Sequence, residues 1–93
     1  MEHVVRDNRY LNRFELQISD EEFASAYYRI EDGIVVLIHT EVPFQYTGEG
    51  YGKKLAAGVF TLLRESGHNA VVKCGFMGRY VARHPEVLDL VKG

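Results

Sequence analysis

The amino-acid sequence predicts an α+β (mixed α/β) fold in which antiparallel strands lead into a parallel strand–helix–strand unit. Strand-like runs joined by short turns occupy residues 14–42, and such turns favour antiparallel pairing. The apolar residues change to a helical period over residues 50–66, and a short apolar strand follows at residues 69–74. The strands on either side of the helix are therefore expected to run parallel, with a right-handed crossover.

The first strands are marked by alternation and by aromatic residues. The stretch FELQI, residues 14–18, alternates apolar and polar side chains, which is typical of a half-buried strand. The polar stretch SDEE, residues 19–22, predicts a turn, and FASAYYRI, residues 23–30, predicts a second strand. Val4 and Val5 are expected to start one further strand before these two.

A hairpin and a buried strand are predicted next. Asp32 and Gly33 separate two strand-like runs, and glycine tolerates the positive φ that a two-residue hairpin turn requires. The run IVVLIHTEV, residues 34–42, begins as a continuous apolar segment, so we expect a strand that is buried on both faces. Pro43 lacks a backbone N–H and ends that strand.

The helical part of the chain has recognisable limits. Its core stripe consists of Leu55, Val59, Leu62 and Leu63. Gly67 is well suited to end this helix. A short helix is expected over residues 77–84, and Pro85 suits the first turn of a last helix with the sequence PEVLDLV.

Bulk properties exclude several classes of protein. The chain has 93 residues, so we expect one domain that spans residues 1–93. Its net charge of −2 does not favour binding to nucleic acid over a broad surface. The single cysteine, Cys74, allows no intrachain disulfide and no metal-type cysteine spacing, which favours the cytoplasm. The charged start of the chain does not resemble a signal peptide, and the apolar run at residues 34–38 is too short to cross a membrane. We expect a monomer or a weak homodimer without metal.

Three glycines, Gly48, Gly50 and Gly52, precede the long helix at every second position. The N-terminus of a helix offers unpaired N–H groups and partial positive charge, and glycine would let a phosphate approach them. A mobile loop that ends in a glycine N-cap is an equal alternative on glycines alone. The P-loop pattern fails, because Thr47 and Lys54 occupy its first glycine and its Ser/Thr position, and the dinucleotide-binding pattern fails as well.

Gln45, Gly48 and Gly50 form a Q-x-x-G-x-G pattern between a strand and a long helix. This pattern resembles the signature of the GNAT superfamily of N-acetyltransferases. The wider stretches HTEVPFQYTGEGYGKKL and KCGFMGRYVARHPEVLDLV are similar to a subgroup of very short, YjdJ-type GNAT-like proteins. The resemblance implies the GNAT-like acyl-CoA N-acyltransferase fold, with a splayed cofactor cleft, and acetyl-CoA as cosubstrate.

The resemblance also implies where acetyl-CoA binds. The pantetheine arm is expected on the strand backbone near Thr40, Glu41 and Val42, and the diphosphate on the N–H groups of residues 48 to 53. The implied cofactor-binding residues are therefore Thr40, Glu41, Val42, Gln45, Gly48, Glu49, Gly50, Tyr51, Gly52 and Lys53. The Glu49 side chain is expected to turn outward. Lys53 and Lys54 point about 100° apart on a helix, so at least one of them is expected to be a solvated surface residue.

Three residues are candidates for the chemistry: Tyr80, Cys74 and Glu41. GNAT enzymes often place a tyrosine after the last parallel strand, so Tyr80 is expected to donate a proton to the leaving sulfur; the alternative is a core or surface tyrosine, one of six tyrosines in the chain. Cys74 forms a transient acetyl-thioester, lines the pocket, or is an inert buried residue. Glu41 shares a strand face with His39 and is the better candidate to orient an amine or a water, since His39 is expected to be a core histidine.

Two functions from different classes follow. The first is an N-acetyltransferase that moves an acetyl group from acetyl-CoA to an unidentified amine, from a protein or a small molecule. The alternative is a non-catalytic module that binds acetyl-CoA or CoA and regulates a partner. Ordinary GNAT enzymes form the acceptor wall with extra N-terminal helices, and only about a dozen residues precede the first clear strand here, so we expect that wall to be missing or to be built by a partner chain. A small interaction domain that binds no nucleotide is a third possibility. Gly75 stands where the subgroup often has proline.

Overall fold

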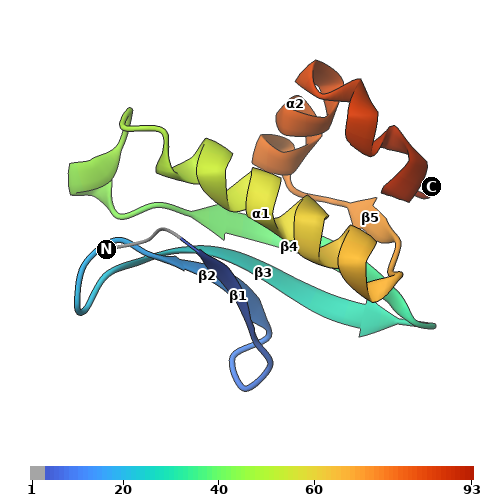
Figure 1. Ribbon diagram of the computed structural model, residues 1–93, viewed down its shortest axis with the longest axis horizontal. Coiled ribbons are helices and arrows are strands. Elements are labelled where there is room, and N and C mark those ends of the chain that lie inside the picture. The colour runs from blue at the N-terminus through green and yellow to red at the C-terminus, as the bar shows by residue number, and fades with distance from the viewer. Residues whose placement is uncertain (1–3) are drawn as a thin grey trace.

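The computed structural model describes residues 4–93, which form one five-stranded sheet with helices packed on it (Figure 1). The strands follow one another across the sheet in chain order: β1 Val5–Asn8, β2 Arg13–Gln17, β3 Phe23–Glu31, β4 Ile34–Glu41 and β5 Ala70–Val72. Neighbours from β1 to β4 pair antiparallel, and β5 pairs parallel with β4. The predicted mixed sheet is confirmed, and so is the further strand expected near Val5.

Within residues 4–93, two α-helices and two short 3₁₀ helices complete the fold: η1 Phe44–Tyr46, α1 Tyr51–Ser66, α2 Gly75–Arg83 and η2 Pro85–Leu90. Both α-helices lie on the same side of the sheet (Figure 1). No helix in the described part of the chain is both long and apolar enough to span a membrane.

The turns follow the sequence closely. Asp32 and Gly33 have φ values of 50° and 77°, which confirms the predicted hairpin turn between β3 and β4 and the positive φ at Gly33, and shows that Asp32 adopts the left-handed conformation as well. Gly67, with φ 73°, ends α1, and its N–H donates to the carbonyl of Arg64. The helix α2 begins at Gly75, two residues before the predicted start, because the N–H of Gly78 donates to the carbonyl of Cys74 at 2.9 Å.

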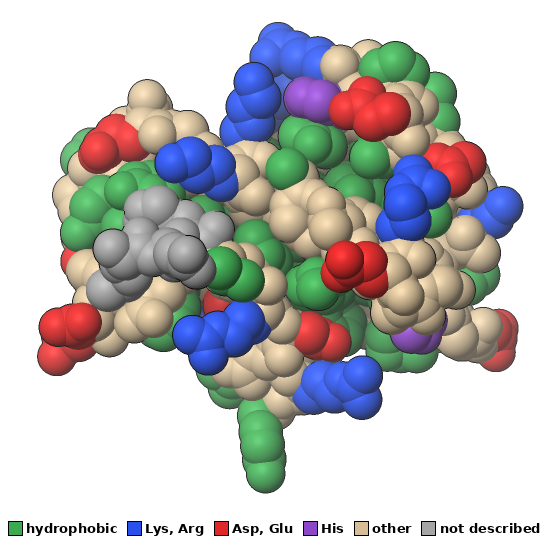
Figure 2. Space-filling model, viewed as in Figure 1, with side chains coloured by type: hydrophobic (Ala, Val, Ile, Leu, Met, Phe, Trp, Pro, Cys, Tyr) green, Lys and Arg blue, Asp and Glu red, His purple; other side chains and the backbone are tan. Residues whose placement is uncertain are grey.

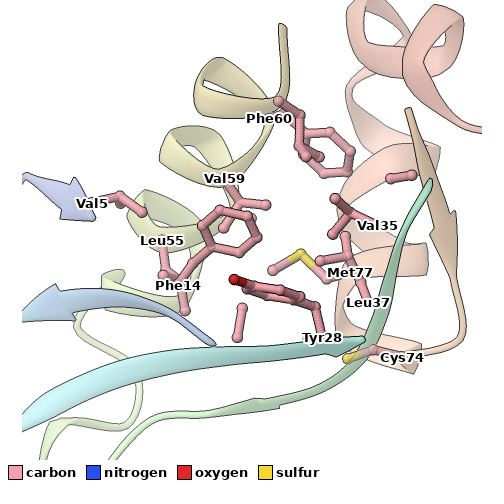
Figure 3. Packing of buried hydrophobic residues seen from close by; sticks show 14 of the residues in the cluster. Val5, Phe14, Tyr28, Val35, Leu37, Leu55, Val59, Phe60, Cys74 and Met77 are labelled. Atoms are coloured by element: carbon pink, nitrogen blue, oxygen red, sulfur yellow. The ribbon is translucent and has the colours of Figure 1, made fainter. Parts of the chain in front are cut away.

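The core lies between the sheet and α1, with α2 closing one end (Figure 3). Phe14, Leu37, Leu55, Val59 and Met77 are among its buried side chains. Close approach of α1 to the sheet depends on Gly58, because a Cβ atom there would stand 2.2 Å from Cγ2 of Val5. The first strand is thereby held directly against the helix.

A β-bulge interrupts β4 just before its end. Tyr28 pairs with Leu37 but Tyr27 pairs with His39, so Ile38 is an extra residue without a partner on β3. The alternation of side chains is shifted by this residue. Thr40 consequently lies on the core side, opposite Ala26, whereas His39 turns to the outer face of the sheet.

The bulge overturns two expectations about β4. Burial on both faces is limited to Val35, Val36 and Leu37, whereas Ile38 is exposed. His39 is not a core residue: its side chain is 59% exposed and contacts Glu41. Period-two alternation places His39 with Leu37 in the core, and the extra residue at Ile38 reverses that placement.

The pairing between β4 and β5 ends early. The parallel ladder runs from Val35 with Ala70 to Leu37 with Val72, and the N–H of Lys73 donates to the carbonyl of Leu37 at 2.9 Å as the last link. Beyond this point β4 continues to Glu41 while the chain after β5 turns into α2. The strands therefore separate at their carboxyl ends, as the predicted fold requires.

Candidate functional site

The glycines before α1 serve two different purposes. Gly48 and Gly50 have φ values of 85° and 84°, a region that side-chain-bearing residues rarely adopt, and no atom lies within 4 Å of a Cβ built on either one. Gly52 has an ordinary helical backbone, but a Cβ there would stand 2.7 Å from Cζ of Phe76. The first two glycines thus shape an open loop, and the third lets α2 approach α1.

The N-terminus of α1 is not capped by a side chain. Gly50 occupies the N-cap position, and its carbonyl accepts from the N–H of Lys54 at 3.1 Å. Within residues 4–93, the N–H groups of Gly48, Gly50, Gly52 and Lys53 donate to no protein acceptor. Unpaired amides at a helix N-terminus carry partial positive charge and favour an anionic ligand.

These amides open onto a pocket of about 540 Å³, a size typical of small-molecule sites. The pocket lies between the end of β4, the loop before α1, and α2. Its lining comprises Thr40, Val42, Tyr46, Thr47, Gly48, Gly50, Tyr51, Gly52, Lys53, Phe76, Arg79, Tyr80, Arg83 and His84. Eight of the residues expected from the sequence meet here: Thr40, Val42, Gly48, Gly50, Tyr51, Gly52, Lys53 and Tyr80.

The other expected residues lie outside this lining. The side-chain amide of Gln45 donates to the carboxylate of Glu22, which also accepts from the Tyr46 hydroxyl at 2.8 Å. Gln45 therefore ties the loop to the turn between β2 and β3, and its side chain does not face the pocket. Glu49 and Glu41 are exposed residues outside the pocket, and Cys74 is buried in the core.

Positive charge lines the pocket, and no acidic residue of the described chain, residues 4–93, joins it there. Lys53, Arg79 and Arg83 contribute cationic side chains, although the whole chain has a net charge of −2. Figure 2 shows Lys and Arg side chains gathered beside α2 and near the start of α1. Lys54 does not line the pocket; its ammonium lies over the Tyr51 ring at 5.7 Å from the centroid. The pocket suits a ligand with more than one negative group.

Arg79, Arg83 and His84 were not identified from the sequence. A signal for them exists in the spacing, because Arg79 and Arg83 are four residues apart and so share one face of α2. Tyr80 and His84 repeat the same spacing one residue further along. The sequence does not reveal that this helix face borders the glycine loop, since that depends on how α2 packs.

Tyr80 is held in a stack of aromatic rings. Its ring is nearly parallel to that of Phe60, with centroids 5.8 Å apart, and to that of His84, at 3.9 Å. Nδ1 of His84 lies 2.8 Å from the carbonyl of Tyr80, which fixes the imidazole by donation from Nδ1. Burial, followed by the charge of Glu86, raises the pKa of Tyr80 above its usual value. The phenol therefore keeps its proton near neutral pH and can act as a donor.

Cys74 lies where β4 and β5 have separated. Its Sγ is 3.3 Å from Oγ1 of Thr40, and the residue is only 8% exposed. Cys74 also occupies the N-cap position of α2, close to the positive end of that helix. Since Thr40 lines the pocket, the sulfur lies directly behind the pocket wall.

A second depression, of about 450 Å³, opens on the outer face of the sheet at the end of β4. It is lined by Phe23, Thr40, Glu41, Val42 and Pro43, and it shares Thr40 and Val42 with the main pocket. Oε1 of Glu41 lies 3.2 Å from Nε2 of His39. The end of β4 therefore separates a cationic pocket from an outer depression that carries a carboxylate.

Comparison with known proteins supports one family. A family model described as GCN5-related N-acetyl-transferase matches residues 13–90. The solution NMR structure of a GCN5-like candidate N-acetyltransferase from Staphylococcus aureus is similar, with a TM-score of 0.72 and 23% sequence identity over 100% of this chain and 92% of that one. No curated protein matches the sequence. Neither match tests the YjdJ-type subgroup, which stays a prediction. Across residues 4–93, no group of three or more His, Cys, Asp and Glu side chains is arranged to hold a metal ion.

Proposed function

Because this chain belongs to the GCN5-related N-acetyltransferase family, we propose that it binds acetyl-CoA in the pocket beside α1 and transfers the acetyl group to an amine. The observation that carries the proposal is the set of unpaired amides at Gly48, Gly50, Gly52 and Lys53, which open onto a cationic pocket. Acetyl-CoA supplies the acetyl group as an activated thioester. The acceptor is an amine whose identity the proposal leaves open.

Two parts of the protein backbone are proposed to bind acetyl-CoA, the loop before α1 and the end of β4. The unpaired amides of Gly48, Gly50, Gly52 and Lys53 hold the diphosphate, with added charge from the Lys53 side chain, whereas the Glu49 N–H already donates to the carbonyl of Tyr46. The edge of β4 near Thr40, Glu41 and Val42 holds the pantetheine arm, whose amide groups can pair with a strand that lacks a neighbour. The early end of the β4–β5 ladder at Leu37 leaves that edge accessible. Gln45 acts indirectly in this scheme, by fixing the loop through Glu22.

Glu41 and Tyr80 divide the proton transfers between them. The acceptor enters by the outer depression, where Glu41, oriented by His39, takes a proton from the amine. The amine nitrogen forms a bond to the thioester carbon as the carbon–sulfur bond breaks. Tyr80 gives its proton to the departing sulfur, so that coenzyme A leaves as a thiol and solvent restores the phenol. This requires a protonated Tyr80, which its raised pKa provides.

Cys74 is proposed as a catalytic residue on one of two routes. In direct transfer, Sγ and its contact with Thr40 shape the wall at the reacting end. In a two-step route, Sγ attacks the thioester first, coenzyme A leaves, and the amine then takes the acetyl group from Cys74. Acid quenching after mixing with acetyl-CoA alone separates the routes, because only the second leaves an acetyl group on Cys74 that mass spectrometry can locate.

The test of the proposed function is a titration followed by turnover. Isothermal titration of the full chain with acetyl-CoA is expected to show saturable binding. Incubation with acetyl-CoA and a panel of amines is expected to release free thiol only when an acceptor is present. Saturable binding without thiol release across the panel would favour the alternative, a non-catalytic CoA-binding regulator, for which the shallow outer depression is the supporting observation. A chain that binds no acetyl-CoA would contradict both.

The setting of this activity is also proposed. Cys74 is a free thiol, which is compatible with a reducing cytoplasm. The net charge of −2 favours small ligands over nucleic acid or a membrane surface as partners. We propose a monomer or a weak homodimer, which sedimentation over a range of protein concentrations would distinguish.

A further inference from the structure

Resting on the proposed function, we propose that Arg79 and Arg83 of α2 form a subsite for the 3′-phosphate of coenzyme A. The protein would then distinguish coenzyme A and its thioesters from the dephospho form, which lacks only that group. Nothing in the glycine loop requires such a distinction, because the loop amides serve the diphosphate that both forms share.

The geometry separates two groups of anion donors around one pocket. Gly48, Gly50, Gly52 and Lys53 line it from the loop and the start of α1. Arg79 and Arg83 line it from α2. Coenzyme A likewise carries its negative charge in two places, a diphosphate and a phosphate monoester on the ribose. Two separate cationic groups in one pocket match this distribution better than a ligand with a single phosphate group.

The arginines are available for such a ligand. Arg13, Arg29 and Arg64 each pair with a carboxylate, at 2.6, 2.9 and 2.8 Å. Arg79 and Arg83, in contrast, form no ion pair or side-chain hydrogen bond with any residue in the described range 4–93.

Their chemistry also fits a phosphate monoester. A guanidinium group presents paired N–H donors in a planar fork that matches two phosphate oxygens. The four-residue spacing places both forks on one face of α2, so they can act on the same dianionic group. Among the residues that the structure describes, no acidic side chain lines the pocket and competes for these donors.

The experiment compares coenzyme A with dephospho-coenzyme A by isothermal titration. Charge-assisted hydrogen bonds of this kind correspond to about 10- to 100-fold in affinity, so the wild-type chain is expected to bind coenzyme A that much more tightly. The double variant Arg79→Gln, Arg83→Gln is expected to bring the ratio of the two dissociation constants close to one, while the affinity for dephospho-coenzyme A stays as in wild type. Arg6→Gln, at an exposed arginine of β1 outside the pocket, is the matched control and is expected to keep the wild-type ratio.

Each other outcome has a definite meaning. Equal binding of both ligands by the wild-type chain overturns the subsite and leaves the proposed function standing. A double variant that loses affinity for both ligands by the same factor also overturns it, since the arginines would then hold the diphosphate. If the wild-type chain binds neither ligand, the proposed function itself fails. Circular dichroism of the double variant checks the fold, which is expected to be retained because both side chains are exposed.

Discussion

Gly52 of α1 lies against the ring of Phe76 of α2, so closely that a Cβ atom at position 52 would stand 2.7 Å from Phe76 Cζ. Both residues line the cationic pocket. The contact therefore sets the distance between the glycine loop and the helix that carries Tyr80. One residue with no side chain links the packing of two helices to the shape of the site.

The first prediction concerns this contact. Gly52→Ala is expected to lower the free energy of unfolding by about 1–3 kcal/mol, because the new methyl group forces Phe76 to move. The affinity for acetyl-CoA should fall as well, and Phe76→Leu in the same chain should restore part of both losses by making room. Gly78→Ala is the control, since nothing lies within 4 Å of a Cβ there and alanine is the better helix former. Urea unfolding and isothermal titration measure the two quantities.

The second prediction separates backbone strain from anion binding. Gly50 and Gly67 have similar positive φ values, 84° and 73°, at opposite ends of α1. Gly50→Glu and Gly67→Glu are each expected to destabilise the fold by about 1–2 kcal/mol, the cost of a side chain in the left-handed region. Only Gly50→Glu is expected to abolish acetyl-CoA binding, because it adds a negative charge beside the loop amides. Comparable loss of binding in both variants would count against the diphosphate site.

Tyr80→Phe tests the proton donor. Removal of the hydroxyl leaves the ring stack with Phe60 and His84 intact, so the free energy of unfolding and the affinity for acetyl-CoA should be nearly unchanged. The value of kcat is expected to fall about 100-fold, as for the loss of a general acid. In the wild-type chain, the raised pKa of Tyr80 should keep the donor protonated, with activity lost only at strongly alkaline pH. Stopped-flow thiol detection measures kcat, and an unchanged kcat in the variant would remove Tyr80 from the chemistry.

Glu41→Gln tests the base on the outer face. The Glu41 side chain does not line the main pocket, so the dissociation constant for acetyl-CoA should stay as in wild type. The value of kcat/KM for the amine is expected to fall by about 100-fold at neutral pH. Glu31→Gln is the matched control, because Glu31 pairs with Arg29 on β3 and lies outside both depressions. A loss of acetyl-CoA affinity as large as the loss of rate would instead mean that Glu41 supports the pocket.

The fifth prediction concerns stability at high pH. The Tyr28 hydroxyl donates to Oδ1 of Asp7 at 2.6 Å, and burial together with this bond raises the pKa of Tyr28 to about 12. A tyrosine in the unfolded chain titrates near 10, so the folded state holds the phenol proton more tightly. The resulting stabilisation, roughly 3 kcal/mol for a shift of about two pKa units, should be complete below about pH 10 and lost as the pH rises towards 12. Tyr28→Phe should be less stable at pH 8 by about 1 kcal/mol and should lack this alkaline decline in urea unfolding.

The arrangement of strands and helices could be predicted because the signals are local. Asp32 and Gly33 require a particular turn, and Gly67 ends α1 wherever the helix packs. The start of α2 was placed too late, because Gly75 is a poor helix former and the sequence does not show that Cys74 supplies the first carbonyl. The last segment forms a 3₁₀ helix, with bonds such as that from Val87 N–H to the His84 carbonyl.

Only the part of the site that is formed by backbone groups could be predicted from the sequence. Gly48 and Gly50 are informative because glycine before a helix has few purposes. The prediction that His39 is a core residue is wrong because it depends on strict alternation along β4. A β-bulge depends on pairing with the neighbouring strand, and no residue type in the sequence predicts it. Arg79 and Arg83 were missed for a similar reason, since an exposed arginine becomes a binding residue only through what its helix packs against.

The extra residue at Ile38 gives β4 a tolerance in its length. Deletion of Ile38 would join Leu37 directly to His39, and these two residues already lie opposite the consecutive residues Tyr28 and Tyr27. Strict alternation would then leave the imidazole and the carboxylate on the outer face and the threonine on the inner one. A single codon can be lost at this point without exchanging the two chemical faces of the molecule, whereas the same loss within β2, which pairs with β3 without an extra residue, would reverse the faces of the residues beyond it.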